Sequence, residues 1–107
     1  MNRPYTLVFD DIMIKQLKKA GRNRKIKEIL SKMFDKIELA GSSVGELIDS
    51  QLFIYEMKNK HPPIRLYFKH NKGTNEIYLF EFEMKTSEEK QQRTIQRIRY
   101  KASQLET

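Results

Sequence analysis

The first forty residues contain one short apolar run followed by two amphipathic stretches. Residues 5–9 are β-branched and aromatic, which favours a strand. Apolar residues then recur at helical spacing up to Gly21, which we expect to end the first helix in a left-handed C-cap conformation. Asn23 is expected to cap a second helix, whose apolar positions follow i, i+3, i+4, i+7, i+8 and i+11 from Ile26. The short link between them predicts an antiparallel helical hairpin.

Residues 44–51 are interpreted as a loop. After them the spacing of apolar residues changes from a helical repeat to the alternation typical of strands. Strands are predicted at residues 52–58, 64–69 and 76–84, and the links between them are short and rich in turn residues. Links of this length join antiparallel neighbours, whereas parallel strands need long crossovers. The middle of the chain is therefore expected to form an antiparallel meander.

The last stretch is charged and helical. Thr86 and Glu89 have the spacing of a capping box, which predicts a helix that begins there. One face of this helix is apolar at Ile95, Ile98, Ala102 and Leu105. The element order is thus β-α-α-β-β-β-α. It predicts an α+β protein with a small, mainly antiparallel sheet and the helical hairpin packed on one face, in a single domain over residues 1–107.

Side chains alternate across a sheet, so each predicted strand presents two faces. The face expected to pack on the hairpin contains Phe53, Tyr55, Met57, Ile64, Leu66, Phe68, Tyr78, Phe80, Phe82 and Met84. The other face is expected to be exposed, and its polar residues are Glu56, Lys58, Arg65, Tyr67, Lys69, Glu81, Glu83 and Lys85. Tight turns would place Arg65 opposite the Glu56–Lys58 region and near Glu81. Solvent-exposed cross-strand ion pairs are the simplest interpretation of these charges.

Composition and charge narrow the classes of function. With 21 Lys and Arg against 14 Asp and Glu, the chain has a formal net charge of +7, which attracts polyanions. Cysteine is absent, which excludes disulfides and a thiol nucleophile, and the two histidines argue against a His-rich metal site. No apolar run approaches the ~20 residues that cross a bilayer. We expect a cytoplasmic domain without metal or other cofactor, not associated with a membrane, and with an anionic partner.

Several local strings resemble one known superfamily. They are YTLVFD at residues 5–10, YEMK at residues 55–58, RLYF at residues 65–68 and FEMKT at residues 82–86, which runs into the charged last helix. Together with the basic helical hairpin, they resemble the RelE/HigB superfamily of toxin–antitoxin ribonucleases, and in particular its phage-derived, HigB-like branch. The resemblance covers nearly the whole chain.

This resemblance implies a type II toxin, a ribosome-dependent and metal-independent endoribonuclease that cuts mRNA and inhibits translation. In such enzymes the ribose 2′-OH attacks the adjacent phosphate. The reaction needs a base for the 2′-OH proton, cations for the phosphorane and an acid for the leaving 5′-oxygen. The implied partners are a cognate antitoxin protein, mRNA and the ribosome.

The resemblance also implies roles for individual residues. The implied catalytic residues are Arg65, Glu56, Lys58 and Lys85, and the implied substrate-binding residues are Tyr67, Lys69 and Arg93. Arg65 would hold the phosphate and stabilise the transition state, since its planar fork suits bidentate contact. Glu56 is the candidate general base, and the two catalytic lysines would act as electrostatic clamps.

The chain departs from the HigB-like pattern at two places. Met84 stands where a second lysine is usual, and Phe80-Glu81 stands where a His-Gly pair is usual. No histidine lies in or beside the last predicted strand, and His61, in the first turn, fits a solvated turn residue better than a general acid. Two alternatives therefore stay open: a ParE-like, non-catalytic inhibitor of a DNA topoisomerase, and a nucleic-acid-binding module.

Overall fold

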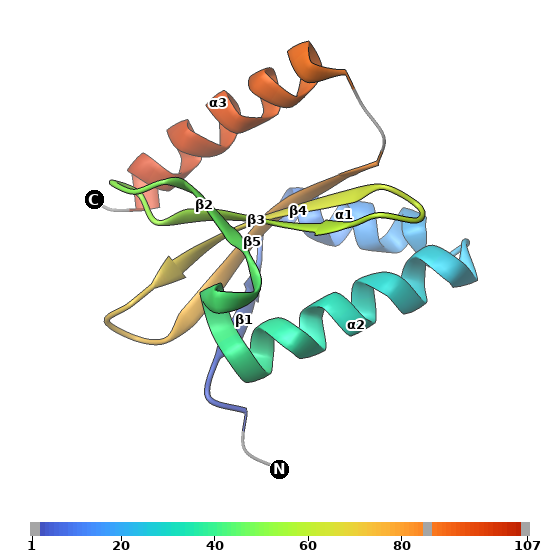
Figure 1. The fold of residues 1–107 in the computed structure, drawn as a ribbon, viewed down its shortest axis with the longest axis horizontal. Helices are drawn as coiled ribbons and strands as arrows, with labels where there is room; N and C mark the ends of the chain where they lie inside the picture. The colour runs from blue at the N-terminus through green and yellow to red at the C-terminus, as the bar shows by residue number, and fades with distance from the viewer. Residues whose placement is uncertain (1–2, 85–86, 106–107) are drawn as a thin grey trace.

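The computed structural model describes residues 3–84 and 87–105, and Figure 1 shows their arrangement. The elements are β1 (Thr6–Phe9), α1 (Asp11–Ala20), α2 (Arg24–Ala40), the 3-10 helix η1 (Gly41–Val44), β2 (Glu46–Asp49), β3 (Ile54–Asn59), β4 (Ile64–Asn71), β5 (Glu76–Met84) and α3 (Glu88–Leu105). The predicted α+β class and the helix–helix–meander–helix order are confirmed. No helix within these described ranges is long and apolar enough to span a membrane.

The sheet has five strands in the order β1-β5-β4-β3-β2, one strand more than predicted. β1 runs parallel to β5, and every other neighbouring pair is antiparallel. The extra strand, β2, lies in the segment that we interpreted as a loop, and that prediction was wrong. Its first two residues are exposed, so the segment lacks an apolar alternation, and pairing of Glu46 with Glu56 and of Leu47 with Tyr55 makes it an edge strand.

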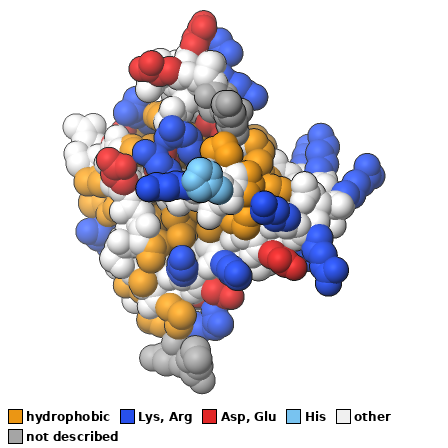
Figure 2. All heavy atoms as spheres, turned by 45° about the vertical axis from the view of Figure 1, so that its right-hand side comes forward, with side chains coloured by type: hydrophobic (Ala, Val, Ile, Leu, Met, Phe, Trp, Pro, Cys, Tyr) orange, Lys and Arg blue, Asp and Glu red, His pale blue; other side chains and the backbone are white. Residues whose placement is uncertain are grey.

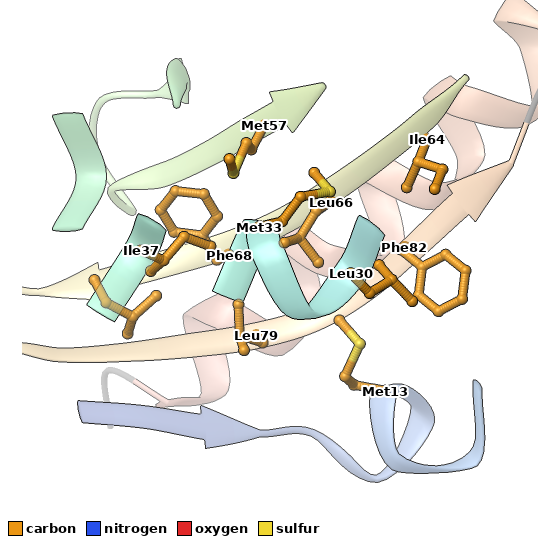
Figure 3. Packing of buried hydrophobic residues seen from close by; sticks show 11 residues of the cluster. Met13, Leu30, Met33, Ile37, Met57, Ile64, Leu66, Phe68, Leu79 and Phe82 are labelled. Atoms are coloured by element: carbon orange, nitrogen blue, oxygen red, sulfur yellow. The ribbon is translucent and has the colours of Figure 1, made fainter. Parts of the chain in front are cut away.

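The sheet lies between two helical layers. α3 covers one face and the α1–α2 hairpin covers the other, as predicted for the hairpin (Figure 1). Figure 3 shows the core on the hairpin side, where Met13 of α1 and Leu30, Met33 and Ile37 of α2 meet side chains of the sheet. The sheet contributes Met57, Ile64, Leu66, Phe68, Ile77, Leu79 and Phe82 to this cluster.

A bulge in β5 reverses part of the predicted face assignment. The β4–β5 register shifts so that Phe80 has no residue opposite it. Between the bulge and the β4–β5 turn, each β5 side chain therefore lies on the face opposite to the one expected. Tyr78 and Phe80 pack towards α3, whereas Ile77 and Leu79 belong to the core on the hairpin side.

Two glycines end the hairpin helices in different ways. Asn23 caps α2 as predicted, because its Oδ1 accepts a hydrogen bond from the Ile26 N–H at 3.2 Å. Gly21 has a right-handed conformation, with φ −57°, so the predicted left-handed cap was wrong. The chain turns there without leaving the α region. The glycine with a positive φ is Gly41, with φ 65° and ψ −142°, where an added Cβ would lie 2.5 Å from the ring of Tyr5.

The last helix begins close to the predicted position. Thr86, the predicted first residue of the capping box, lies outside the described residues. The hydroxyl of Ser87 accepts a hydrogen bond from the Lys90 N–H at 3.1 Å and so caps α3. Of the predicted apolar face, three residues are buried and Leu105 is exposed. This apolar face fixes which side of α3 lies on the sheet.

Candidate functional site

The face of the sheet that carries the predicted site residues is covered by α3. Ile95, Ile98 and Ala102 pack on Ile54, Tyr67 and Phe80, which form a second buried cluster. The expectation of an exposed polar face was therefore wrong over most of its length. Glu56, Tyr67, Glu81 and Glu83 are all buried. The physical reason is the apolar side of α3, which must be buried against a surface, and the hairpin already occupies the other face.

The buried carboxylates in the middle of this face are hydrogen-bonded. Glu83 accepts from the hydroxyl of Tyr67 at 2.9 Å and from the hydroxyl of Thr94 at 2.7 Å. Glu81 receives two bonds from the Arg97 guanidinium, at 2.7 and 3.3 Å. Burial, and then the neighbouring Glu83 carboxylate, raise the pKa of the Tyr67 hydroxyl. The hydrogen bond with Glu81 raises the pKa of Arg97. The middle of the face thus holds α3 in place.

Two further carboxylates hold the C-terminal half of α3. Asp10 lies between the Lys101 ammonium and the Tyr78 hydroxyl, each at 2.7 Å. Burial alone would raise the pKa of Asp10, but the hydrogen bonds from Lys101, Tyr78 and the Ile12 backbone outweigh it and lower the pKa. Burial, and then the hydrogen bond with Asp10, raise the pKa of Tyr78 to about 12. At the edge of the sheet, Arg99 pairs with Asp49 at 3.0 Å.

The N-terminal end of α3 leaves a cluster of charged residues partly open. Glu56 is 4% exposed, and its Oε2 accepts from the Arg65 guanidinium at 3.1 Å and from the Gln91 amide at 3.2 Å. Its Oε1 lies 3.5 Å from the Lys58 ammonium. The side chains of Arg65 and Lys58 are 35% and 51% exposed. We call these three residues, Glu56, Lys58 and Arg65, the Arg65 cluster.

The strand register explains why these three residues meet. Lys58 is paired with Arg65 across β3 and β4, so Arg65 lies opposite the Glu56–Lys58 region as predicted. Arg65 was also expected near Glu81, but on β5 it lies opposite Glu83. The bulge accounts for one residue of this two-residue shift, because the register on the turn side of the bulge would place Phe82 opposite Arg65. The other residue comes from the β4–β5 turn, which is longer than the tight turn that we expected.

The other predicted site residues do not join the Arg65 cluster in the described structure. Lys85 falls outside the described residues. Tyr67 is fully buried beneath α3. Lys69 is buried at the far end of β4, where its ammonium donates to the Leu52 carbonyl at 2.6 Å. Arg93 is exposed on α3 and pairs with Glu89 on its own helix at 3.4 Å. Of the described candidates, Glu56, Lys58 and Arg65 are joined by ion pairs. Tyr67 is paired with Glu56 across β3 and β4 and so lies beside them, but it is closed off from solvent.

The Arg65 cluster combines two accessible cations with one buried anion. Glu56 already accepts from Arg65 and Gln91 and lies near Lys58, so in this arrangement it orients the cations. An accessible guanidinium held in this way suits a phosphate group. Figure 2 shows Lys and Arg side chains gathered beside a histidine on one face of the molecule. Across residues 3–84 and 87–105, no group of His, Asp and Glu is arranged to hold a metal ion.

Sequence reasoning missed the residues of α3 that complete this face. Gln91, Thr94 and Arg97 follow one another at intervals of three and bond to Glu56, Glu83 and Glu81, respectively. A signal was present, since these polar positions lie beside the apolar positions of α3 and so belong to its buried side. The sequence pattern did not indicate on which face of the sheet α3 docks.

Comparisons with known proteins show similarity in structure alone. No protein-family model and no curated protein sequence matches the chain. The isolated RelE toxin of E. coli has a TM-score of 0.63 and 19% identity, over 88% of this chain and 98% of that chain. RelBE2, a toxin–antitoxin complex of Mycobacterium tuberculosis, gives 0.62 and 16%, over 77% and 99%. The YoeB–YefM toxin–antitoxin complex of Staphylococcus aureus gives 0.57 and 19%, over 78% and 97%. This protein therefore has the fold of the RelE and YoeB toxins.

Proposed function

We propose that this protein is the toxin of a type II toxin–antitoxin system and that it cuts mRNA on the ribosome, in the cytoplasm. The observation that carries the proposal is the Arg65 guanidinium. It is accessible on a sheet with the RelE fold, oriented by the buried Glu56 and accompanied by Lys58. Such an arrangement is suited to a phosphodiester, whose charge increases during cleavage.

In the proposed reaction the ribose 2′-oxygen attacks the adjacent phosphorus. The new 2′-O–P bond forms as the P–O5′ bond breaks, which leaves a cyclic phosphate and a 5′-hydroxyl. Arg65 and Lys58 stabilise the extra negative charge of the phosphorane, and Lys85 is a further candidate for this role. Glu56 orients Arg65 in the resting state and accepts the 2′-OH proton once substrate phosphate has drawn the guanidinium away. The proton on the leaving 5′-oxygen comes from solvent or from an accessible group near this end of the sheet.

The proposed partner is an acidic antitoxin. Among the structural neighbours, E. coli RelE occurs in complex with the antitoxin RelB, and S. aureus YoeB with YefM. For this chain, the charge of +7 favours an acidic protein as well as RNA. The strings at residues 55–58 and 65–68 further favour the HigB-like branch of the superfamily.

A second candidate function is non-catalytic binding, either inhibition of a DNA topoisomerase or binding of nucleic acid. The burial of three titratable groups favours this function. Tyr67, Glu81 and Glu83 are buried and already hydrogen-bonded, so they are not available for proton transfer with a substrate. Proton transfer then depends on Glu56 or on solvent. A protein that only binds needs the two exposed cations and no proton acceptor.

Expression in a bacterial host separates these functions. We expect expression of the chain alone to arrest growth, and co-expression of the neighbouring small reading frame to restore it. Primer extension on mRNA from arrested cells should then show cuts within translated regions. A matched transcript without its ribosome-binding site should remain intact. Cleavage of both transcripts would remove the ribosome from the proposal, and intact mRNA with DNA damage would replace the ribonuclease with the topoisomerase inhibitor.

A further inference from the structure

A phenylalanine is exposed between two lysines at the opposite end of the sheet from Arg65. Phe53 lies in the link between β2 and β3, and 37% of it is exposed. The ammonium of Lys72 lies 5.0 Å from the centroid of its ring, and that of Lys69 lies 5.9 Å away. The neighbouring Leu52 packs against the cluster beneath α3, whereas Phe53 belongs to neither core cluster. The position of this ring is thus not explained by packing.

The backbone holds Phe53 in this exposed position. Its φ of 55° is in the left-handed region, which bulky L-residues rarely adopt. Two hydrogen bonds tie the segment to β4: the His70 N–H donates to the Phe53 carbonyl at 3.1 Å, and Lys69 donates to the Leu52 carbonyl at 2.6 Å. The Leu52 N–H also donates to Asp49 Oδ1 at 2.9 Å. A strained residue that is held in place in this way is typical of a binding site.

A cavity of about 330 Å³ is lined in part by Lys69, whose ammonium lies 5.9 Å from the centroid of the ring. Phe53 itself does not line the cavity. The other lining residues are Val8, Asn71, Glu76, Tyr78 and Leu105. Amide and carboxylate groups such as those of Asn71 and Glu76 can hydrogen-bond the edge of a nucleobase.

We propose that Phe53 is a stacking platform for one base of single-stranded RNA. Lys72, which is exposed, contacts the adjacent phosphate, and Lys69 holds the platform in place. Exposed aromatic rings beside cations bind single strands in this manner, since every base has a flat π-face. The positive charge of the chain favours the same ligand. That the RNA is mRNA rests on the proposed function. The inference that Phe53 stacks on a base of single-stranded RNA does not rest on it.

The platform engages a different nucleotide from the one that Arg65 would hold. Arg65 and Lys69 are four residues apart on β4, which corresponds to roughly 14 Å at ~3.4 Å per residue. Successive stacked bases are only ~3.4 Å apart. The platform would therefore fix the register of a strand on the protein at a distance from the Arg65 cluster.

Base stacking is measured directly with a short single-stranded oligoribonucleotide that contains 2-aminopurine, at low salt and with the full chain. We expect binding by the unaltered protein to change the 2-aminopurine fluorescence. Phe53→Leu should weaken binding between about 5-fold and 150-fold and abolish this change, as expected for the loss of one stacked base. Phe53→Tyr should retain both. Tyr100→Leu, at an exposed aromatic residue on α3, is the matched control and should bind as the unaltered protein does.

The contribution of Lys72 is measured by salt dependence. Loss of one phosphate contact in Lys72→Gln should reduce the slope of log affinity against log salt by about 0.7. Binding by Phe53→Leu that equals that of the unaltered protein would overturn the proposal. Equal binding per nucleotide of a long RNA duplex would also overturn it, since the interior bases of a duplex are already stacked on both faces and cannot stack on the ring.

The same variants separate this proposal from the proposed function. If the unaltered protein cuts mRNA but its 2-aminopurine signal does not depend on Phe53, the platform is wrong and the ribonuclease stands. If the signal depends on Phe53 but mRNA remains intact, the platform stands and the ribonuclease is wrong. Thermal unfolding of Phe53→Leu, compared with that of Tyr100→Leu, shows whether a loss of binding reflects a loss of fold.

Discussion

The two faces of the sheet are covered by helices that different interactions hold in place. On the hairpin side, the cluster consists of eleven buried apolar residues. On the α3 side, six buried residues form a smaller cluster. Four carboxylates on that side are also buried, and each accepts a hydrogen bond from α3. They are Asp10, Glu56, Glu81 and Glu83.

This difference indicates a division of roles between the faces. Burial of apolar surface stabilises the fold without depending on the protonation state or charge of any side chain. Buried carboxylates contribute only while their partners are present, and each is costly once its partner is removed. The hairpin side therefore stabilises the fold, whereas the α3 side holds charges in defined positions and leaves the Arg65 cluster accessible at its end.

The largest effect on stability is expected on the hairpin side. Leu66 is fully buried in that cluster, and Leu66→Ala should lower the free energy of unfolding by about 2–5 kcal/mol. Leu39→Ala, at an exposed position of α2, is the matched control and should change it by less than about 0.5 kcal/mol. Urea denaturation measures both. Similar losses in the two variants would mean that the hairpin face does not dominate stability.

A smaller loss is expected from the hydrogen bonds beneath α3. Tyr67→Phe removes one donor to Glu83 but leaves the bond from Thr94. The free energy of unfolding should fall by about 1–3 kcal/mol, because one oxygen of a buried carboxylate loses its partner. Hydrogen exchange should increase in α3 before it increases in α2. Tyr100→Phe removes an exposed hydroxyl and should change neither quantity. Equal exchange in the two helices would show that the faces are not independent.

Acid should weaken the α3 side selectively. The unfolded chain takes up a proton at Asp10 near its ordinary pKa of 3.8, whereas the folded chain takes it up only at a lower pH. The contribution of this group to stability is therefore present above the ordinary pKa and is lost as the pH falls through the lower, folded value. Asp49 acts with the same sign, because hydrogen bonds, first from the Leu52 backbone, lower its pKa.

The variant Asp10→Asn isolates this effect. It keeps an acceptor for the Ile12 N–H that caps α1 but has no charge for Lys101. Denaturation between pH 2 and 6 should show a weaker dependence of stability on pH in Asp10→Asn than in the unaltered protein. Parallel curves for the two proteins would contradict the expected role of Asp10.

The smallest effect is expected at the edge of the α3 side. Arg99 is half-exposed, and its pair with Asp49 is open to solvent on one side. Arg99→Gln should therefore lower the free energy of unfolding by less than about 1 kcal/mol. Arg97→Gln should cost more, because the carboxylate of Glu81 is buried and loses both of its hydrogen bonds. Denaturation at low and high salt measures both, and a larger loss in Arg99→Gln would contradict the ranking.

The hairpin side could be predicted from the sequence because the residues that determine its helices lie close together along the chain. The spacing of apolar residues from Ile26 onwards and the cap at Asn23 determine α2 without reference to the rest of the chain. β2 could not be predicted in the same way. Its residues are mostly exposed or half-exposed, and only the pairing with β3 makes it a strand. The conformation of Gly21 was also missed, since a tight right-handed turn needs no glycine.

The α3 side was harder to predict because its structure depends on contacts between residues that are far apart along the chain. The bulge at Phe80 reverses the faces of four residues of β5, and nothing in the alternation of that strand marks it. The polar residues of the sheet suggested a solvated surface because their partners, such as Thr94 and Arg97, lie on a helix whose docking face is set by tertiary packing. The Arg65 cluster was predictable in part, because the β3–β4 register follows from the short turn between those strands.

The most direct test of the Arg65 cluster is the rate of mRNA cleavage on translating ribosomes in vitro. Arg65→Ala should lower this rate by about 100-fold or more. The variant should lose some stability, because the buried Glu56 loses one partner, but it should remain folded at the assay temperature, since Gln91 and Lys58 still contact Glu56. Lys58→Ala and Lys85→Ala should lower the rate less, and Arg99→Ala, which removes an arginine remote from the cluster, should leave it unchanged. Cleavage by Arg65→Ala at the rate of the unaltered protein would contradict the assignment of this cluster as the active site.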